Sequence, residues 1–159
     1  MINIEVNKGI NFSNLLSLRK KITQEQFNNE MVKISGIFES NQVKKSGPII
    51  TTTFMVETIN GENYFDMEIL VPMDRKVDLP SDYNFKQLFK IVNAVYVRHE
   101  GNPAFLQKVY DEMLLYITKN SLQQITPAYN VTVKDLLPGM SADELVIDVY
   151  IGVSENILW

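Results

Sequence analysis

The feature of this sequence that most constrains its fold is an internal repeat. Two stretches with apolar residues at helical spacing begin at residues suited to an N-cap, Thr23 and Asn102. A shift of 79 residues carries Thr23 onto Asn102, and the same shift carries Pro48 onto Pro127. Each proline therefore follows its cap by 25 residues (23 to 48, and 102 to 127). This agreement predicts one supersecondary unit that occurs twice along the chain.

Each repeat has the pattern of a strand, a helix and two further strands, and the segment 59–61, Ile-Asn-Gly, is a hairpin signal. We predict an α+β fold in which two pseudo-symmetric β-α-β-β repeats form one curved antiparallel sheet with both helices on one face. The chain is expected to be a single domain, 1–159. Its parts are a first repeat at 10–73, a linker at 74–87 and a second repeat at 88–153. The expected strands are 15–22, 46–56, 65–73, 93–100, 125–133 and 145–153.

Both predicted helices have a defined start and one apolar face. Thr23 and Gln26 have the spacing of a capping box, and Asn102 followed by Pro103 is typical of a helix start. We expect both apolar faces to pack against the sheet. They comprise Phe27, Met31, Ile34, Ile37 and Phe38 in the first helix, and Phe105, Leu106, Val109, Met113, Leu114 and Ile117 in the second.

The composition argues against several classes of function. The net charge of −4 lacks the basic footprint of a nucleic-acid-binding protein, so we expect no nucleic-acid partner. The chain has no Cys and one His, which leaves no thiol chemistry and no His-rich metal site, so neither a metal nor a cofactor is expected. No apolar run reaches the roughly 18–20 residues that cross a bilayer, so membrane insertion is not expected. The first residues lack a signal-peptide pattern, and the cytoplasm is the expected compartment.

Alternation along the last strand of each repeat separates two faces. One face is apolar and is expected to seat the helix. The other face carries polar and aromatic residues, and the first strands add to it by the same alternation. The apolar residues are Phe65, Met67, Ile69, Val71 and Met73, and Leu145, Ile147, Val149, Ile151 and Val153. The opposite face carries Tyr64, Asp66, Glu68, Leu70, Glu144, Val146, Asp148 and Tyr150, with Ser17, Arg19, Tyr96 and Arg98.

This second face permits two interpretations. If the sheet is curved, the face becomes concave, and a concave surface with few polar anchors is the usual form of a ligand site. An antiparallel sheet can also leave one face in water, and Arg19 with Glu68, and Arg98 with Asp148, would then be cross-strand ion pairs. His99, at the end of its strand, is expected to be structural or exposed rather than catalytic.

The chain resembles the GyrI-like (gyrase-inhibitor-like) small-molecule-binding domains, over roughly residues 10–155. The second repeat carries the better match, with VYVRHEGNPAFLQKVYDEMLLYITKNSLQQITPAY and the closing strand ELVIDVYIGV, and YFDMEILVPM is similar to the same strand in the first repeat. The closing strand differs from the family pattern at two positions. Asp148 replaces the usual Glu, and Gly152 replaces the usual Pro.

The resemblance implies that an organic, often cationic, ligand binds in a cleft between the two repeats, and that an acidic residue meets its charge. By position, that role falls to Glu68 or Asp148. The candidate ligand-binding residues are Glu68, Asp148, Tyr150, Tyr96, Tyr64, Arg19 and Arg98.

Two other functions remain open. The length and repeat layout are loosely similar to small uncharacterised proteins of Firmicute type VII secretion clusters, which would imply an accessory role with a protein partner. The terminal Trp159 could serve such a contact or pack against the domain. An enzyme is not expected; the enzymatic alternative is a hydrolase that uses Glu68 and Asp148 as acid and base.

Overall fold

We analysed a computed structural model of the chain, which describes residues 2–134 and 139–155. Contacts within the chain divide it into two compact units. The first, here called the α1 unit, is Asn11–Phe89, and the second, the α2 unit, is Met1–Ile10 with Lys90–Trp159. Trp159 lies outside the described residues, and so do four residues of the loop before the last strand.

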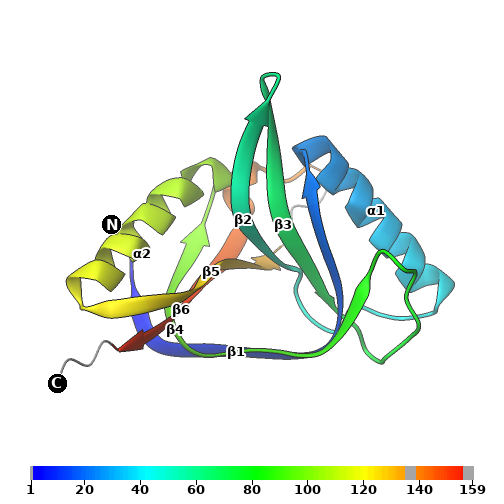
Figure 1. The fold of residues 1–159 in the computed structure, drawn as a ribbon, viewed down its shortest axis with the longest axis horizontal. Helices are drawn as coiled ribbons and strands as arrows, with labels where there is room; N and C mark the ends of the chain where they lie inside the picture. Colours follow the sequence, from blue (N-terminus) through cyan, green and yellow to red (C-terminus); the bar gives the residue numbers. More distant parts are fainter. Residues whose placement is uncertain (1, 135–138, 156–159) are drawn as a thin grey trace. The chain divides into compact units, whose positions relative to one another are not determined.

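The α1 unit contains β1 (Glu5–Ile22) from Asn11 onward, α1 (Gln24–Ser40), β2 (Ile50–Ile59) and β3 (Glu62–Pro72), as Figure 1 shows. Strand β3 lies between β1 and β2 and pairs antiparallel with both. Asn60 and Gly61, with φ of 53° and 79°, form the predicted hairpin turn between β2 and β3. The pairing of β1 ends at Ile22 opposite Phe65, so the hairpin continues beyond it.

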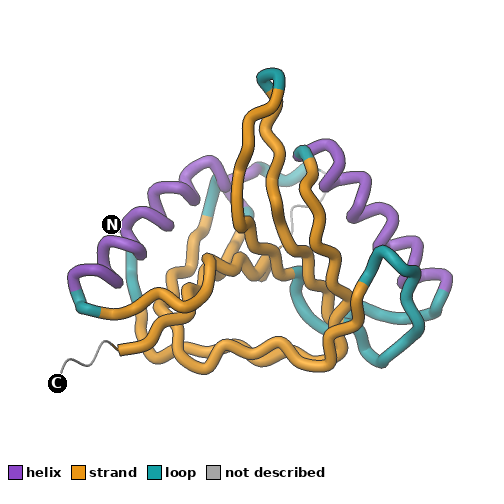
Figure 2. Tube along the Cα trace, viewed as in Figure 1, coloured by secondary structure: helices purple, strands orange, loops and turns teal. Residues whose placement is uncertain are grey.

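The α2 unit repeats this plan with β4, α2, β5 and β6, in the order β4, β6, β5 with antiparallel pairing. The predicted α+β class and the β-α-β-β order of both repeats are confirmed. Figure 2 distinguishes the helices, strands and loops. The bounds are β4 (Asn84–Glu100), the 3-10 turn η1 (Pro103–Phe105), α2 (Leu106–Lys119), β5 (Leu122–Lys134), the 3-10 turn η2 (Ala142–Glu144) and β6 (Val146–Glu155).

Two strands begin much earlier than the sequence predicted. Strand β1 begins at Glu5 rather than at residue 15, and β4 begins at Asn84 rather than at residue 93. Asn7 and Asn14 adopt left-handed φ values of 58° and 56°, which interrupt the regular alternation of β1 and explain why its first part does not look like a strand. Both strands continue from one unit into the other along the chain.

The early part of β1 lies close to β4 within the α2 unit. A Cβ built on Gly9 would lie 2.7 Å from the carbonyl oxygen of Ile91, a distance that real Cβ atoms do not tolerate. Only glycine permits this close approach of two backbones. Gly9 therefore allows the short distance between the backbones of β1 and β4 in this unit.

The helix starts agree with the predicted capping residues. The hydroxyl of Thr23 accepts a hydrogen bond from the amide of Gln26, whose side chain in turn accepts one from the amide of Thr23. Asn102 caps the other start, and its side-chain oxygen accepts a hydrogen bond from the amide of Ala104 at 2.9 Å. The helix itself begins at Leu106, because residues 103–105 form a 3-10 turn.

Each unit has its own apolar core, in which the helix packs on the predicted strand face. The α2 helix differs from the prediction, because Phe105 and Leu114 are exposed and its buried stripe runs through Val109, Met113 and Ile117. The core of the α1 unit centres on Leu16, Leu18, Ile22, Ile34, Val43, Met67, Ile69, Val71 and Met73, and that of the α2 unit on Val95, Val97, Val109, Met113, Ile117, Ile147, Val149, Ile151 and Val153.

The segment between β3 and β4 contributes to the core of the α1 unit. Val77, Leu79 and Tyr83 pack against this core, together with Phe85 at the start of β4. The last residues of the predicted linker, 84–87, belong to β4.

Candidate functional site

Four of the predicted site residues, Arg19, Glu68, Arg98 and Asp148, occupy equivalent rows of the two units, on the strand faces that point away from the helices. In each unit, the central strand carries a buried carboxylate that lies opposite an arginine on one side. The alternation that the sequence predicted is therefore confirmed. The row of the α1 unit comprises Arg19, Glu68 and Thr52, and the row of the α2 unit comprises Arg98, Asp148 and Val131.

Asp148 is held by a bidentate ion pair. Arg98 donates from Nε to Oδ1 at 2.7 Å and from Nη2 to Oδ2 at 2.9 Å. The Tyr96 hydroxyl donates a further hydrogen bond to Oδ1 at 2.8 Å. The hydrogen bond to Asp148 raises the pKa of Arg98 well above its ordinary value. The predicted Arg98–Asp148 pair is confirmed, and it occupies both oxygens of a carboxylate that is 6% exposed.

A row of three tyrosines lies beside this pair. Tyr96 faces Tyr150 across the strands, and Tyr150 faces Tyr129 on its other side. The rings of Tyr96 and Tyr150 have centroids 5.0 Å apart and are tilted by 44°, a favourable aromatic geometry. Burial, followed by the hydrogen bond to Asp148, raises the pKa of Tyr96 to about 12. Burial also raises the pKa of Tyr150.

Glu68 is as buried as Asp148, but its partners differ. The Ser17 hydroxyl and the Lys86 ammonium each donate to Oε2 at 2.6 Å. The Glu68 residue is 6% exposed, whereas the side chain of Lys86 is 42% exposed. Lys86, a long side chain that reaches solvent, therefore contributes a positive charge that balances Glu68.

Arg19 lies opposite Glu68 as predicted, but its guanidinium bonds to Asp66. The Nε–Oδ1 and Nη2–Oδ2 distances are 3.3 and 3.2 Å. The register of β2 shifts between Thr53 and Met55, and the intervening Phe54 lies with its ring centroid 3.9 Å from the guanidinium carbon. This bulge gives Arg19 a cation–π contact towards the hairpin, which explains why its side chain extends to Asp66.

Tyr64 is not brought near the buried carboxylate of its unit. It lies opposite Glu57 near the end of the hairpin, four residues before Glu68. That separation corresponds to about 13 Å along a strand. Of the candidate residues, Tyr96, Arg98, Asp148 and Tyr150 therefore form one cluster, and Arg19, Glu68 and Tyr64 are spread along the β1–β3–β2 sheet of the α1 unit.

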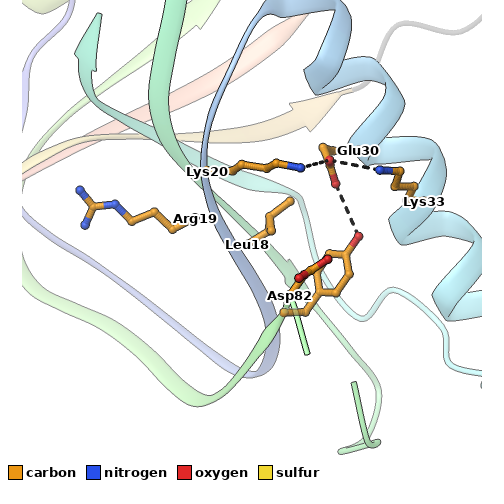
Figure 3. Close-up of a pocket in the computed structure, with 7 residues that line it drawn as sticks. Leu18, Arg19, Lys20, Glu30, Lys33 and Asp82 are labelled. Atoms are coloured by element: carbon orange, nitrogen blue, oxygen red, sulfur yellow. Dashed lines mark hydrogen bonds and ion pairs between the residues drawn. The ribbon is translucent and has the colours of Figure 1, made fainter. Parts of the chain in front are cut away.

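A polar pocket of about 260 Å³, which the sequence did not predict, lies on the helix-packed side of the α1 unit (Figure 3). Glu30, from α1, lies in it and is 4% exposed. Lys20 Nζ donates to Glu30 Oε1 at 2.9 Å, and Lys33 Nζ lies 3.5 Å from the same oxygen. The pocket is lined by Leu18, Arg19, Lys20, Glu30, Lys33, Asp82 and Tyr83.

The charges of this pocket are mutually stabilised. Burial would raise the pKa of Glu30, but the hydrogen bonds and charges of Lys20 and Lys33 together lower it below its ordinary value. The hydrogen bond to Glu30 raises the pKa of Lys20. Glu30 and Lys20 are therefore both ionised at neutral pH.

Two signals in the sequence could have revealed the pocket. Lys20 continues the alternation of Leu18 and Ile22 and so lies on the helix-packed face. Glu30 follows Phe27 by three residues and precedes Ile34 by four, so it lies on the apolar face of α1. A lysine and a glutamate on two faces that pack together require each other as partners.

Other candidate chemistry finds no support in the described part of the chain. His99 Nε2 lies 2.9 Å from the carbonyl oxygen of Asn102, a contact that ties the strand end to the helix cap. Residues 2–134 and 139–155 contain no group of three or more His, Cys, Asp or Glu side chains that could hold a metal. Neither described helix is long and apolar enough to cross a membrane.

No protein-family model matches the chain, and no curated protein matches it. Solved structures do match. The C-terminal domain of EcmrR superposes with a TM-score of 0.81 at 14% identity, over 98% of this chain and 99% of that domain. The EcmrR chain solved in complex with DNA superposes with a TM-score of 0.78 at 14% identity. The superposition covers 98% of this chain but 58% of that EcmrR chain.

Two proteins from Listeria innocua share the fold less closely. An uncharacterised conserved protein has a TM-score of 0.64 at 11% identity, with 93% of both chains covered. A hydrolase has a TM-score of 0.58 at 13% identity, with 93% of this chain and 92% of that chain covered. At these identities the likeness is one of fold.

Proposed function

We propose that this chain is a GyrI-like small-molecule-binding module, and that it binds an organic cation at Glu68. The sequence motifs of both closing strands and the fold shared with the EcmrR C-terminal domain support the general class. The contacts of the two buried carboxylates support the choice of Glu68 over Asp148.

One observation carries the proposal, namely the partly exposed counterion of Glu68. A buried carboxylate interacts with a cation far more strongly than an exposed one does, because water screens the charges less. Lys86 holds that place through a flexible, partly exposed side chain, which can turn into water when a ligand cation arrives. At Asp148 the ligand would have to displace a bidentate guanidinium, which is a much stronger partner.

The surroundings of Glu68 suit an organic ligand rather than a bare ion. Leu70 and Ile50 form the neighbouring row on the same face, and Ser17 completes it. All three are buried, and Ser17 also holds the carboxylate through its hydroxyl. Apolar side chains around one oriented charge are typical of small-molecule sites. In the α2 unit, the tyrosine row offers a separate surface on which aromatic rings can stack.

The test is a calorimetric titration of the protein with organic cations such as tetraphenylphosphonium and ethidium. We expect Glu68→Gln to weaken binding about tenfold or more, since it removes the charge that the ligand meets. Lys86→Met should strengthen binding, because it removes the competing ammonium. Asp148→Asn should leave the affinity within about threefold, and Glu62→Gln, at an exposed position of the hairpin, should change nothing.

Two results would overturn the proposal. If the parent protein binds none of the cations and co-purifies with a protein partner, an interaction protein, such as an accessory component of a type VII secretion system, becomes the better explanation. If Glu68→Gln binds as tightly as the parent, the ligand charge is met elsewhere.

We also propose that the chain is not an enzyme. A hydrolase that uses Glu68 and Asp148 as acid and base would need both groups to exchange protons with substrate. Asp148 has both oxygens occupied by Arg98, which disfavours such a role. Hydrolysis of ester or phosphoester test substrates that disappears in Asp148→Asn would contradict this view.

A further inference from the structure

The pocket around Glu30 is separate from the site proposed at Glu68. Alternation along β1 directs Ser17 and Arg19 to one face and Leu18 and Lys20 to the other. Glu30 approaches Lys20 from α1, and Tyr83 reaches the same carboxylate from the segment between β3 and β4. The pocket therefore lies on the helix-packed side, whereas Glu68 lies on the opposite side of the same sheet.

The two oxygens of Glu30 are unequally satisfied. Oε1 faces the ammonium groups of Lys20 and Lys33, at 2.9 and 3.5 Å. For Oε2, the hydrogen bond within the described residues comes from the Tyr83 hydroxyl at 3.5 Å, the outer limit for such a bond. A carboxylate whose side chain is 6% exposed normally has stronger partners. Oε2 can therefore accept a bond from a further donor.

The charges around the pocket balance. Lys20 and Lys33 supply two positive charges, and Glu30 and Asp82 supply two negative ones. Arg19 also lines the pocket, but its guanidinium points away from Glu30 in Figure 3 and bonds to Asp66. The side chains of Lys20 and Lys33 are 50% and 62% exposed, so their remaining donors can reach a ligand. A ligand with one charge of each sign matches this arrangement best.

The size of the pocket limits the ligand to a small molecule. Its volume of about 260 Å³ lies below the roughly 300 Å³ at which sites for drug-sized ligands begin. Leu18 supplies an apolar part of the lining, so a short apolar side chain on the ligand can be accommodated.

The α2 unit shows that the fold does not require this charged cluster. The shift of 79 residues that aligns the repeats carries Glu30 onto Val109 and Lys20 onto His99. Val109 is 3% exposed and belongs to the core of its unit. A valine therefore suffices at this position of the helix, and the polar cluster of the α1 unit needs another explanation.

We propose that this pocket binds a small zwitterion of the free amino-acid type. The ligand ammonium donates to Glu30 Oε2 and lies near the Tyr83 hydroxyl, while the ligand carboxylate accepts hydrogen bonds from Lys20 and Lys33. The short side chain of the ligand contacts Leu18.

The first experiment titrates the protein with glycine, alanine and leucine, using calorimetry and backbone amide chemical shifts. Acetate and methylammonium serve as analogues that carry one of the two charges. We expect the amino acids to bind and each single-charge analogue to bind at least about tenfold more weakly. The amide shifts should change at residues 18–20, 30–33 and 82–83. Binding of acetate as tight as that of the amino acids, or no binding by any of them, would overturn the proposal.

The second experiment uses variants that the α2 unit suggests. Glu30→Val should abolish amino-acid binding while the protein stays folded, because valine occupies the equivalent position of α2. Lys33→Met should weaken binding about tenfold, and it provides an independent test because Lys33 is exposed. Glu68→Gln should leave amino-acid binding unchanged, which separates this site from the one proposed for organic cations. Full binding by Lys33→Met or Glu30→Val would contradict the assignment.

Discussion

The two units of the molecule share a backbone plan and a helix-packed core, yet they treat the same carboxylate position differently. In the α2 unit, Asp148 is fixed by a guanidinium and a tyrosine hydroxyl. In the α1 unit, Glu68 is held by the Ser17 hydroxyl and the ammonium of Lys86. The core restricts substitution on the helix side, because apolar residues must fill it. The opposite face tolerates substitution. One carboxylate can therefore be paired with a bidentate arginine while the other is paired with a partly exposed lysine.

A second difference concerns one tight contact between a glycine and a larger residue. The glycine comes first along the chain in the α1 unit and second in the α2 unit. In the α1 unit, Gly47 faces Pro72, and a Cβ on Gly47 would lie 3.3 Å from the proline ring. In the α2 unit, Thr126 and Gly152 occupy the corresponding positions, and the Gly152 amide donates to the Thr126 hydroxyl at 2.8 Å. This bond explains why Gly152 replaces the proline expected from the family resemblance, since proline has no amide hydrogen.

The largest effect is expected from the two cores. Ile69→Ala and Val149→Ala should lower the free energy of unfolding by about 3 and about 2 kcal/mol respectively, because each removes side-chain carbon from a fully packed site. Denaturant titration measures both. If the cores are equivalent, the losses should scale with the carbon removed, and a much smaller loss in one variant would break the equivalence. Tyr64→Phe, at a half-buried position on the other face, is the control and should cost much less.

The next effect separates the two carboxylates. Asp148→Asn should lower the free energy of unfolding by about 2 kcal/mol, because it weakens charge-assisted hydrogen bonds to a buried group. Glu68→Gln should cost less, since Lys86 can turn into solvent and Ser17 can still donate to the amide oxygen. Thermal and denaturant unfolding of both variants measures the difference. Equal losses would mean that Lys86 holds Glu68 as firmly as Arg98 holds Asp148.

A smaller effect is expected where the tight contacts differ. Gly152→Ala should cost about 1–3 kcal/mol, because its Cβ would lie 2.7 Å from the Thr126 methyl group. Thr126→Gly relieves that overlap, as glycine does at position 47. The double variant should therefore lose less stability than the sum of the losses of the two single variants. If the free-energy losses of the two single variants add up strictly in a double-mutant cycle, the side chains at positions 126 and 152 are not sterically coupled.

The smallest effect appears at alkaline pH. Burial and the bond to Asp148 raise the pKa of Tyr96 to about 12 from an unfolded value of about 10. Its contribution to stability is therefore complete below about pH 10 and is lost as the pH rises through about 12. Tyrosinate absorbance should show a component that titrates near pH 12 and is missing in Tyr96→Phe. Ser17 occupies the equivalent position in the α1 unit, so no counterpart of this group is expected there.

The sequence predicted the elements of the fold better than the contacts of the site. Caps, apolar spacing and the Asn60-Gly61 turn depend on neighbours along the chain, and they are found, except that Phe105 and Leu114 of the second predicted apolar face are exposed. Arg98 and Asp148 were paired correctly because they lie directly opposite each other on neighbouring strands. The partner of Glu68 was missed because Lys86 comes from a segment that did not look like a strand, and Arg19 was drawn to Asp66 by a bulge that alternation does not reveal.

Strands β1 and β4 have a consequence for how the molecule unfolds. Each has residues in both units, and Gly9 allows the first part of β1 to lie close against β4 in the α2 unit. A protein with two separate cores often melts in two steps, one for each core. Here the unfolding of either unit releases strands that also form part of the other unit. Melting of the whole chain as a single cooperative transition is therefore the expected behaviour, and we expect neither half to stay folded when it is produced alone.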